Sequence, residues 1–152
     1  LGFDRSMIMS YGQDDRVCAY TSLAAMLGTD AELEKTACCL LVDKEEIGSV
    51  GATGMQSKFF ENVVAELISL EGDYNDLKLR RCLANSKMLS SDVNAGYDPL
   101  FADAFEKKNA SFCGRGVVFS KFTGSRGKSG SNDANAEYIA KLRKIMDDNN
   151  EK

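Results

Sequence analysis

The acidic residues of this sequence gather at positions where they could do chemistry together. They open a helical pattern or follow an apolar segment: Asp14, Asp15, Glu45, Glu46 and Asp92. In open α/β sheets, ligands collect at the carboxyl ends of the strands. Carboxylates that meet there stabilise a divalent cation and are stabilised by it. The spacing therefore raises the hypothesis that these acids converge on one metal site.

The adjacent pair Glu45 and Glu46 suits two different tasks. Neighbours on an extended turn point in different directions, so one carboxylate can ligate a metal while the other reaches a metal-bound water. Such a water must have its pKa lowered and its proton accepted. Ordinary explanations compete with this one, because residues 43–46 also suit a solvated loop and Asp14 could simply cap a helix. On spacing alone, these ordinary interpretations are favoured.

A second candidate lies in the glycine-rich segment 123–133, where Gly127, Lys128 and Ser129 imitate the end of a phosphate-binding loop. That motif needs a glycine at the position of Phe122, and helical spacing resumes only near residue 134. A nucleotide- or phosphate-binding function is therefore a minor alternative. Two interpretations of the segment stay open: an ordinary surface loop, or a basic loop in which Arg126 and Lys128 reach a substrate carboxylate.

Composition limits the function classes. The chain has 152 residues, the size of one ordinary domain that can bury a core. A net charge of −4 argues against nucleic-acid binding, and no apolar stretch is long enough to cross a membrane. Five cysteines without CxxC spacing predict reduced, mostly buried thiols in a cytoplasmic protein. The absence of histidine excludes an imidazole base or ligand from these residues themselves.

The periodicity of apolar residues indicates alternating helices and strands. Helical spacing covers 15–27, which ends at Gly28, and also 56–70, 73–83, 98–109 and 134–146. Strands are predicted at 36–42, 87–93 and 116–122. The continuous apolar run of the first indicates a central strand that is buried on both faces. This alternation is typical of a layered α/β domain.

Four blocks of the sequence resemble the aspartyl aminopeptidase and aminopeptidase I family of co-catalytic zinc aminopeptidases. They occur in the order found in that family and span nearly the whole chain: YGQDDRVCAYTSL, VDKEEIGSVGATGMQSKFFEN, LSSDVNAGYDP and KFTGSRGKSGSNDANAEY. Four blocks in register are far more specific than one acid pair. The resemblance implies a three-layer α/β catalytic domain in which helices flank a central mixed sheet.

The resemblance also implies a role for each acid. Asp15 is similar to the carboxylate that bridges two zinc ions, and Glu46 and Asp92 resemble ligands of one ion each. Glu45 resembles the general base that takes a proton from the metal-bound water. Other divalent metals such as Mn²⁺ or Co²⁺ would also suit such a site. Arg126 and Lys128 are weaker candidates for contacts with a peptide substrate.

The sequence departs from the family pattern because two histidine ligands have no counterpart in it. Residues 1–152 are similar to the middle of the catalytic domain, without the upstream and downstream segments that carry those histidines and without the dimerisation insert. Asp15, Glu46 and Asp92 supply only oxygen ligands, which suit Mg²⁺, Mn²⁺ or Ca²⁺ better than zinc. By themselves these residues are expected to bind metal weakly and to lack useful catalysis.

The function implied is removal of an acidic or neutral N-terminal residue from peptides by a metal-activated water. The alternative is a catalytically inactive fragment, or a partner-binding subunit, of the same fold. The family forms tetrahedral dodecamers, so a homo-oligomer is expected for the full-length chain. No nucleic-acid or membrane partner is expected.

Overall fold

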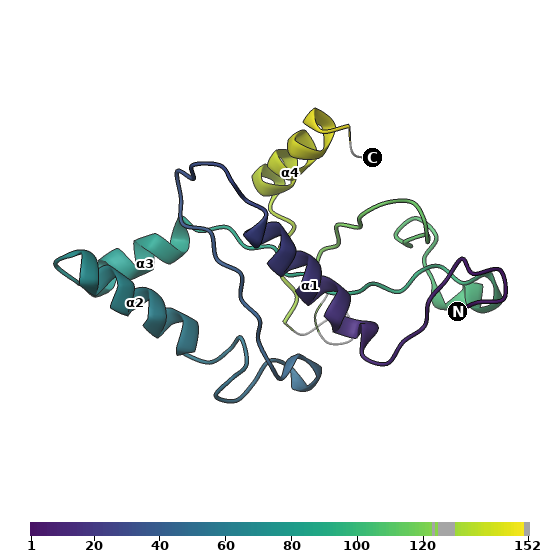
Figure 1. The fold of residues 1–152 in the computed structure, drawn as a ribbon, viewed down its shortest axis with the longest axis horizontal. Coiled ribbons are helices and arrows are strands. Elements are labelled where there is room, and N and C mark those ends of the chain that lie inside the picture. The colour runs from purple at the N-terminus through teal and green to yellow at the C-terminus, as the bar shows by residue number, and fades with distance from the viewer. Residues whose placement is uncertain (123, 125–129, 151–152) are drawn as a thin grey trace. The chain divides into compact units, whose positions relative to one another are not determined.

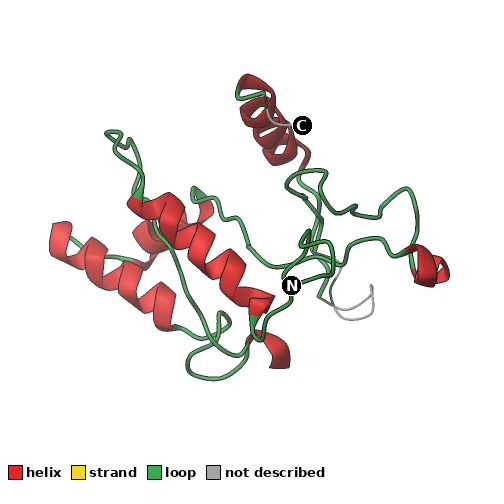
Figure 2. Ribbon diagram, turned by 45° about the vertical axis from the view of Figure 1, so that its right-hand side comes forward, coloured by secondary structure: helices red, strands yellow, loops and turns green. Residues whose placement is uncertain are grey.

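The computed structural model describes residues 1–122, 124 and 130–150 of the chain. These residues form two compact units, Leu1–Val93 and Asn94–Lys152. Helices are the dominant regular structure in both units (Figures 1 and 2). In chain order they are α1 (Gln13–Leu27), η1 (Glu45–Ile47), α2 (Phe59–Glu71), α3 (Asp76–Ala84), η2 (Pro99–Ala104) and α4 (Ala136–Asp148), of which η1 and η2 are 3₁₀ helices.

The four α-helices form where the apolar spacing predicts them. Gly28 ends α1 as predicted, and its N–H donates to the carbonyl of Ala24 at 2.9 Å. The second helix begins at Phe59 rather than at residue 56. Its start is delayed because the backbone N–H of Gln56 donates to the carbonyl of Ser49 in the preceding loop, at 3.0 Å. Local hydrogen bonding therefore overrides the apolar pattern at this boundary.

The helix predicted at 98–109 is much shorter in the structure. Only η2 forms there, and Phe101 departs from helical φ and ψ within it. The Asp98 side chain accepts a hydrogen bond from the N–H of Leu100 at 2.9 Å, which starts the turn. At Phe105 the backbone is already extended, so the helix cannot continue.

The central sheet predicted from 36–42, 87–93 and 116–122 is not confirmed. Among the described residues, β-pairing consists of one isolated parallel bridge between Gly96 and Ser111, and Figure 2 draws the rest as helix and loop. Apolar runs favour extended backbone, but a strand exists only when ladder hydrogen bonds join it to a neighbour. The three segments lack such neighbours in the part of the chain that the structure describes.

Burial is much lower than the composition predicts. Within the described residues, Leu79 is the one buried large hydrophobic side chain, with 7% of its surface exposed. Leu40 and Val42 of the predicted central strand are 39% and 50% exposed, so the prediction of burial on both faces is wrong. A side chain needs packed layers on every side to be buried, and no second layer formed by the described residues covers this run. The expected single core is therefore not found in these residues.

The cysteines follow the same pattern. Cys18 and Cys39 are half-buried, whereas Cys38, Cys82 and Cys113 are exposed, and all five are free thiols. The prediction of mostly buried thiols is therefore wrong, because three of the five are exposed. No helix of the described residues is long and apolar enough to span a bilayer.

The first unit contains a helical hairpin, in which α2 and α3 lie side by side (Figure 1). Leu79 of α3 is buried there. Asn75 caps α3, because its side-chain oxygen accepts a hydrogen bond from the N–H of Lys78 at 3.0 Å. This hairpin is the best-packed part of the first unit.

The second unit is held by polar and aromatic contacts. Asn94 Nδ2 donates to Ser111 Oγ at 2.9 Å. The Tyr97 ring packs against Phe105 and Phe112, with ring centroids 5.5 and 5.1 Å away. These contacts bring residues 94–97 against residues 105–112.

Candidate metal centre

The site begins at the irregular start of α1. Gly12 precedes the helix with a left-handed φ of 70°, and no side chain caps the first turn. Asp14 and Asp15 have non-helical φ and ψ, and the peptide bond between them is cis. The interpretation of Asp14 as a simple helix cap is therefore wrong.

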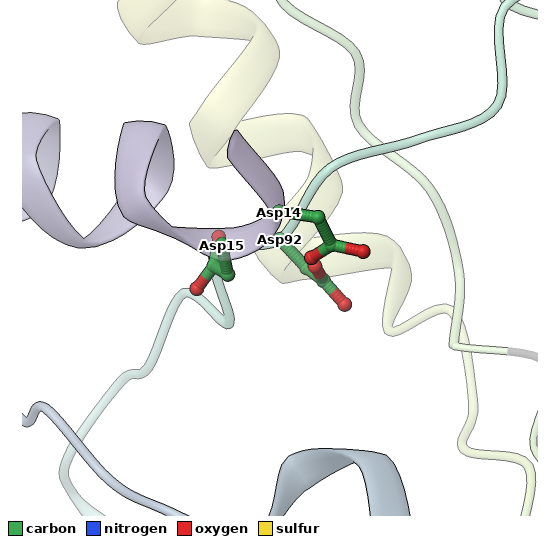
Figure 3. A group of neighbouring side chains, drawn as sticks. All are labelled: Asp14, Asp15 and Asp92. Carbon is green, nitrogen blue, oxygen red and sulfur yellow. The ribbon is translucent and has the colours of Figure 1, made fainter. Parts of the chain in front are cut away.

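Three carboxylates come together in the first unit. One carboxylate oxygen each from Asp14, Asp15 and Asp92 lies within 4.8 Å of the other two (Figure 3). Asp14 and Asp15 come from the start of α1, and Asp92 comes from the extended segment 87–93. All three side chains are exposed, and Asp92 Oδ1 accepts a hydrogen bond from the N–H of Val93 at 2.7 Å. Two segments that are distant in the sequence thus supply one acidic cluster.

The cluster fits a divalent cation by charge and donor type. Among the described residues, the ion pairs of Lys44, Lys58 and Lys144 involve other acids, so none of them neutralises this cluster. A divalent cation would remove the mutual repulsion of the three carboxylates. Three oxygens alone suit a hard cation, and a zinc site would normally add nitrogen or sulfur ligands. The chain itself contains no histidine to supply nitrogen.

Glu45 lies within the electric field of the cluster. Desolvation raises the pKa of the Glu45 carboxyl above its ordinary value. Repulsion adds to this rise in pKa, from the charges of Asp92, Glu46, Asp14 and Asp15. Glu45 and Glu46 are both exposed in η1. An elevated pKa makes a carboxylate a better proton acceptor, as a general base requires.

A closed loop, residues 43–56, presents η1. At its ends, the N–H of Asp43 donates to the carbonyl of Thr53 at 3.3 Å, and Thr53 Oγ1 donates to Asp43 Oδ2 at 3.4 Å. In its middle, the N–H of Ser49 donates to the carbonyl of Lys44 at 2.7 Å. Gly54 is buried, and a Cβ at this position would lie 2.2 Å from the carbonyl oxygen of Ser49. The glycine is needed because the loop folds back on its own backbone.

Cys18 is a neighbour of the cluster that the sequence analysis did not single out. Its half-buried thiol lies near the side chains of Asp15 and Ser91, which both affect its pKa. Desolvation and then the side chain of Asp15 raise the pKa of the thiol. No spacing rule predicts this neighbour, because Asp15 has non-helical φ and ψ.

The structure places the predicted site residues unequally. Asp15 and Asp92 belong to the acidic cluster, and Glu45 lies in its field. Asp14, which the sequence analysis considered but gave no ligand role, joins them, whereas Glu46 is outside the three-residue group. Arg126 and Lys128 lie outside the described residues.

Comparison with known proteins identifies the family of this chain. Residues 1–151 match the family model described as aminopeptidase I zinc metalloprotease (M18). A probable M18 family aminopeptidase 1 of Clostridium acetobutylicum is 64% identical over 145 residues, which are 95% of this chain and 31% of the relative. Aspartyl aminopeptidase 4 of Saccharomyces cerevisiae is 30% identical, over 77% of this chain and 26% of the relative.

A solved structure shows the same likeness. The crystal structure of an M18 family aminopeptidase from Thermotoga maritima matches with a TM-score of 0.88 and 40% identity, over 99% of this chain and 33% of that one. The chain thus spans about a third of the length of these relatives. The match to the family model over nearly the whole sequence shows that this chain belongs to the M18 family of aminopeptidases.

Proposed function

We propose that this protein is a zinc-dependent aminopeptidase that hydrolyses the N-terminal peptide bond of its substrates. The observation that carries the proposal is the convergence of Asp14, Asp15 and Asp92 on one point, with Glu45 in their field. Membership of a family described as zinc metalloproteases supports zinc as the metal. The whole activity belongs to a protein with the length of its relatives, of which this chain spans about a third.

The residues that would hold metal are Asp15, Glu46 and Asp92, and two zinc ions are the proposed metal content. Asp14 lies close enough to Asp15 and Asp92 to add a fourth carboxylate. Histidine ligands would come from outside these 152 residues, because none lies within them. A metal bound at such a centre lowers the pKa of water and polarises the scissile carbonyl. Mn²⁺ or Co²⁺ could replace zinc.

Glu45 is the proposed general base. Its raised pKa favours acceptance of a proton from the attacking water. The same carboxyl group would then hand that proton to the departing amine, which must leave as a neutral group. Neighbouring acids thus serve this step by making the ionised form of Glu45 less stable.

Substrate choice and assembly extend the proposal. An acidic or neutral N-terminal residue is the expected substrate group, and Arg126 and Lys128 are the candidate contacts for an acidic one. A cytoplasmic homo-oligomer, up to a tetrahedral dodecamer, is the expected assembly. Activity on acidic and neutral aminoacyl substrates, with an Arg126→Ala and Lys128→Ala pair, would separate these substrate classes.

The proposal is tested by Glu45→Gln in the full-length protein. The substitution keeps the size of the side chain but removes the proton acceptor, so turnover should fall by about 100-fold or more. Bound metal, measured by elemental analysis, should stay at the wild-type level. Wild-type turnover in this variant would exclude the role of Glu45.

The alternative is a catalytically inactive or partner-binding protein of the same fold. The purified wild-type protein distinguishes the two, because the proposed enzyme releases N-terminal residues from peptides and loses this activity with a chelator. A protein that binds metal but releases no amino acid would favour the inactive alternative.

A further inference from the structure

We infer that Gln56 is a positioning residue that holds Glu45 in place by fastening the loop 43–56. This inference rests on the proposed function, because it assigns a role in delivering the general base. Gln56 Nε2 donates to the carbonyl oxygen of Gly48 at 2.6 Å, and the backbone N–H of Gln56 donates to the carbonyl of Ser49 at 3.0 Å. One residue thus makes two hydrogen bonds to the turn that follows Glu45.

The two bonds act at the end of the short helix η1. Gly48 ends η1 with a left-handed φ of 90°, and its N–H donates to the carbonyl of Glu45 at 2.8 Å. The side-chain amide of Gln56 therefore donates to the carbonyl of Gly48, and the N–H of the same glycine donates to the carbonyl of Glu45. A displacement of Gly48 would move the backbone from which the Glu45 side chain projects.

The turn after Glu45 also has a backbone bond of its own, from the N–H of Ser49 to the carbonyl of Lys44 at 2.7 Å, and Gln56 joins this turn to the far end of the loop. Thr53 and Asp43 close the ends of the loop at 3.3 and 3.4 Å, near the upper limit for a hydrogen bond. The short helix has only three residues, Glu45–Ile47, and no side chain caps it. An exposed three-residue helix has little stability of its own, so its position depends on these backbone bonds together with the two bonds that Gln56 makes.

Gln56 has no acid–base chemistry of its own, because an amide does not titrate in water. Its contribution is the placement of the carboxylate that does. Displacement of a catalytic group by about 1 Å can cost about 100-fold in rate. Loss of the Gln56 side-chain bond should therefore lower kcat, measured at saturating metal, and leave KM nearly unchanged.

The test is Gln56→Met in the full-length protein, which keeps the side-chain length but removes the N–H donor. We expect kcat at saturating metal to fall by about 10- to 100-fold, with KM and melting temperature close to wild type. Gln56→Asn keeps the amide but shortens its reach, and should show the same loss. The matched control is Ser57→Ala, because the Ser57 hydroxyl accepts from the N–H of Phe59 at 3.4 Å and does not contact η1.

The outcomes separate this inference from the proposed function. If Glu45→Gln abolishes turnover while both Gln56 variants keep wild-type kcat, the inference is wrong and the proposed function stands. If the melting temperature of Gln56→Met falls in step with kcat, Gln56 is a general structural residue and the inference is also wrong. If Glu45→Gln itself keeps wild-type turnover, the proposed function fails first.

Discussion

The starts of α1 and α3 place acidic residues in similar sequence positions but use them differently. Asn75 begins α3 with extended backbone, its side chain accepts from the N–H of Lys78, and Asp76 lies in the first turn. This arrangement satisfies free N–H groups and complements the helix dipole. The start of α1 follows left-handed Gly12, lacks a side-chain cap and gathers its aspartates with Asp92.

The contrast teaches that an acidic helix start can serve stability or a ligand site, but the same carboxylate rarely serves both well. Aspartates that converge with another acid repel one another and leave the first turn uncapped. Such an arrangement lowers stability in the absence of a cation. Substitutions at α1 should therefore change metal binding, whereas substitutions in the α2–α3 hairpin should change folding.

The largest expected effect is at Asp15. Asp15→Asn removes one charge from the cluster and one proposed metal ligand, so metal affinity should fall by about 100-fold or more. Chelator competition would measure this change. The melting temperature of the metal-free protein should stay the same or rise, because repulsion in the cluster decreases. A lower melting temperature with unchanged metal affinity would make Asp15 a structural residue and remove the contrast with α3.

The next effect is at Leu79 of the α2–α3 hairpin. Leu79→Ala removes the buried side chain of the hairpin and should lower the free energy of unfolding by about 2–3 kcal/mol. Urea unfolding would measure this loss, with the exposed Leu70→Ala as control. Metal affinity, expressed per folded molecule, should remain at the wild-type level. A parallel loss of metal affinity would show that the two regions are not separable.

The smallest effect is at the cap of α3. Asn75→Ala removes the side-chain acceptor for the N–H of Lys78 and should cost about 1 kcal/mol of stability. Asn75→Asp keeps an acceptor and should restore most of that loss. Thermal unfolding of the metal-free protein would measure both. If Asn75→Ala were neutral, the difference between the two helix starts would not be one of capping.

The helices were predictable because their information is local. Apolar residues at helical spacing and Gly28 as the end of α1 were sufficient to predict that helix within two residues of its observed start. The predicted strand at 36–42 depends on hydrogen bonds from neighbours that are distant in sequence. The described residues contain no such neighbours for it, so an apolar run alone could not predict its environment.

The site was predictable to a different degree at each residue. Sequence positions raised the hypothesis that Asp15 and Asp92 meet, and the described part of the chain brings their carboxylates together without the sheet on which that hypothesis relied. The inclusion of Asp14 depends on non-helical φ and ψ at the start of α1, which a regular helix pattern does not contain. The hydrogen bond from Gln56 to Gly48 depends on how the loop 43–56 folds back, and no rule of residue spacing predicts that fold.

The most direct test of the acidic cluster is an anomalous scattering map at the zinc edge, from crystals of the full-length protein grown with zinc. The account predicts a peak within bonding distance of carboxylate oxygens of Asp15 and Asp92, and a weaker or absent peak in crystals of Asp15→Asn. Zinc bound elsewhere, with these carboxylates free, would contradict the assignment of this cluster as the metal centre.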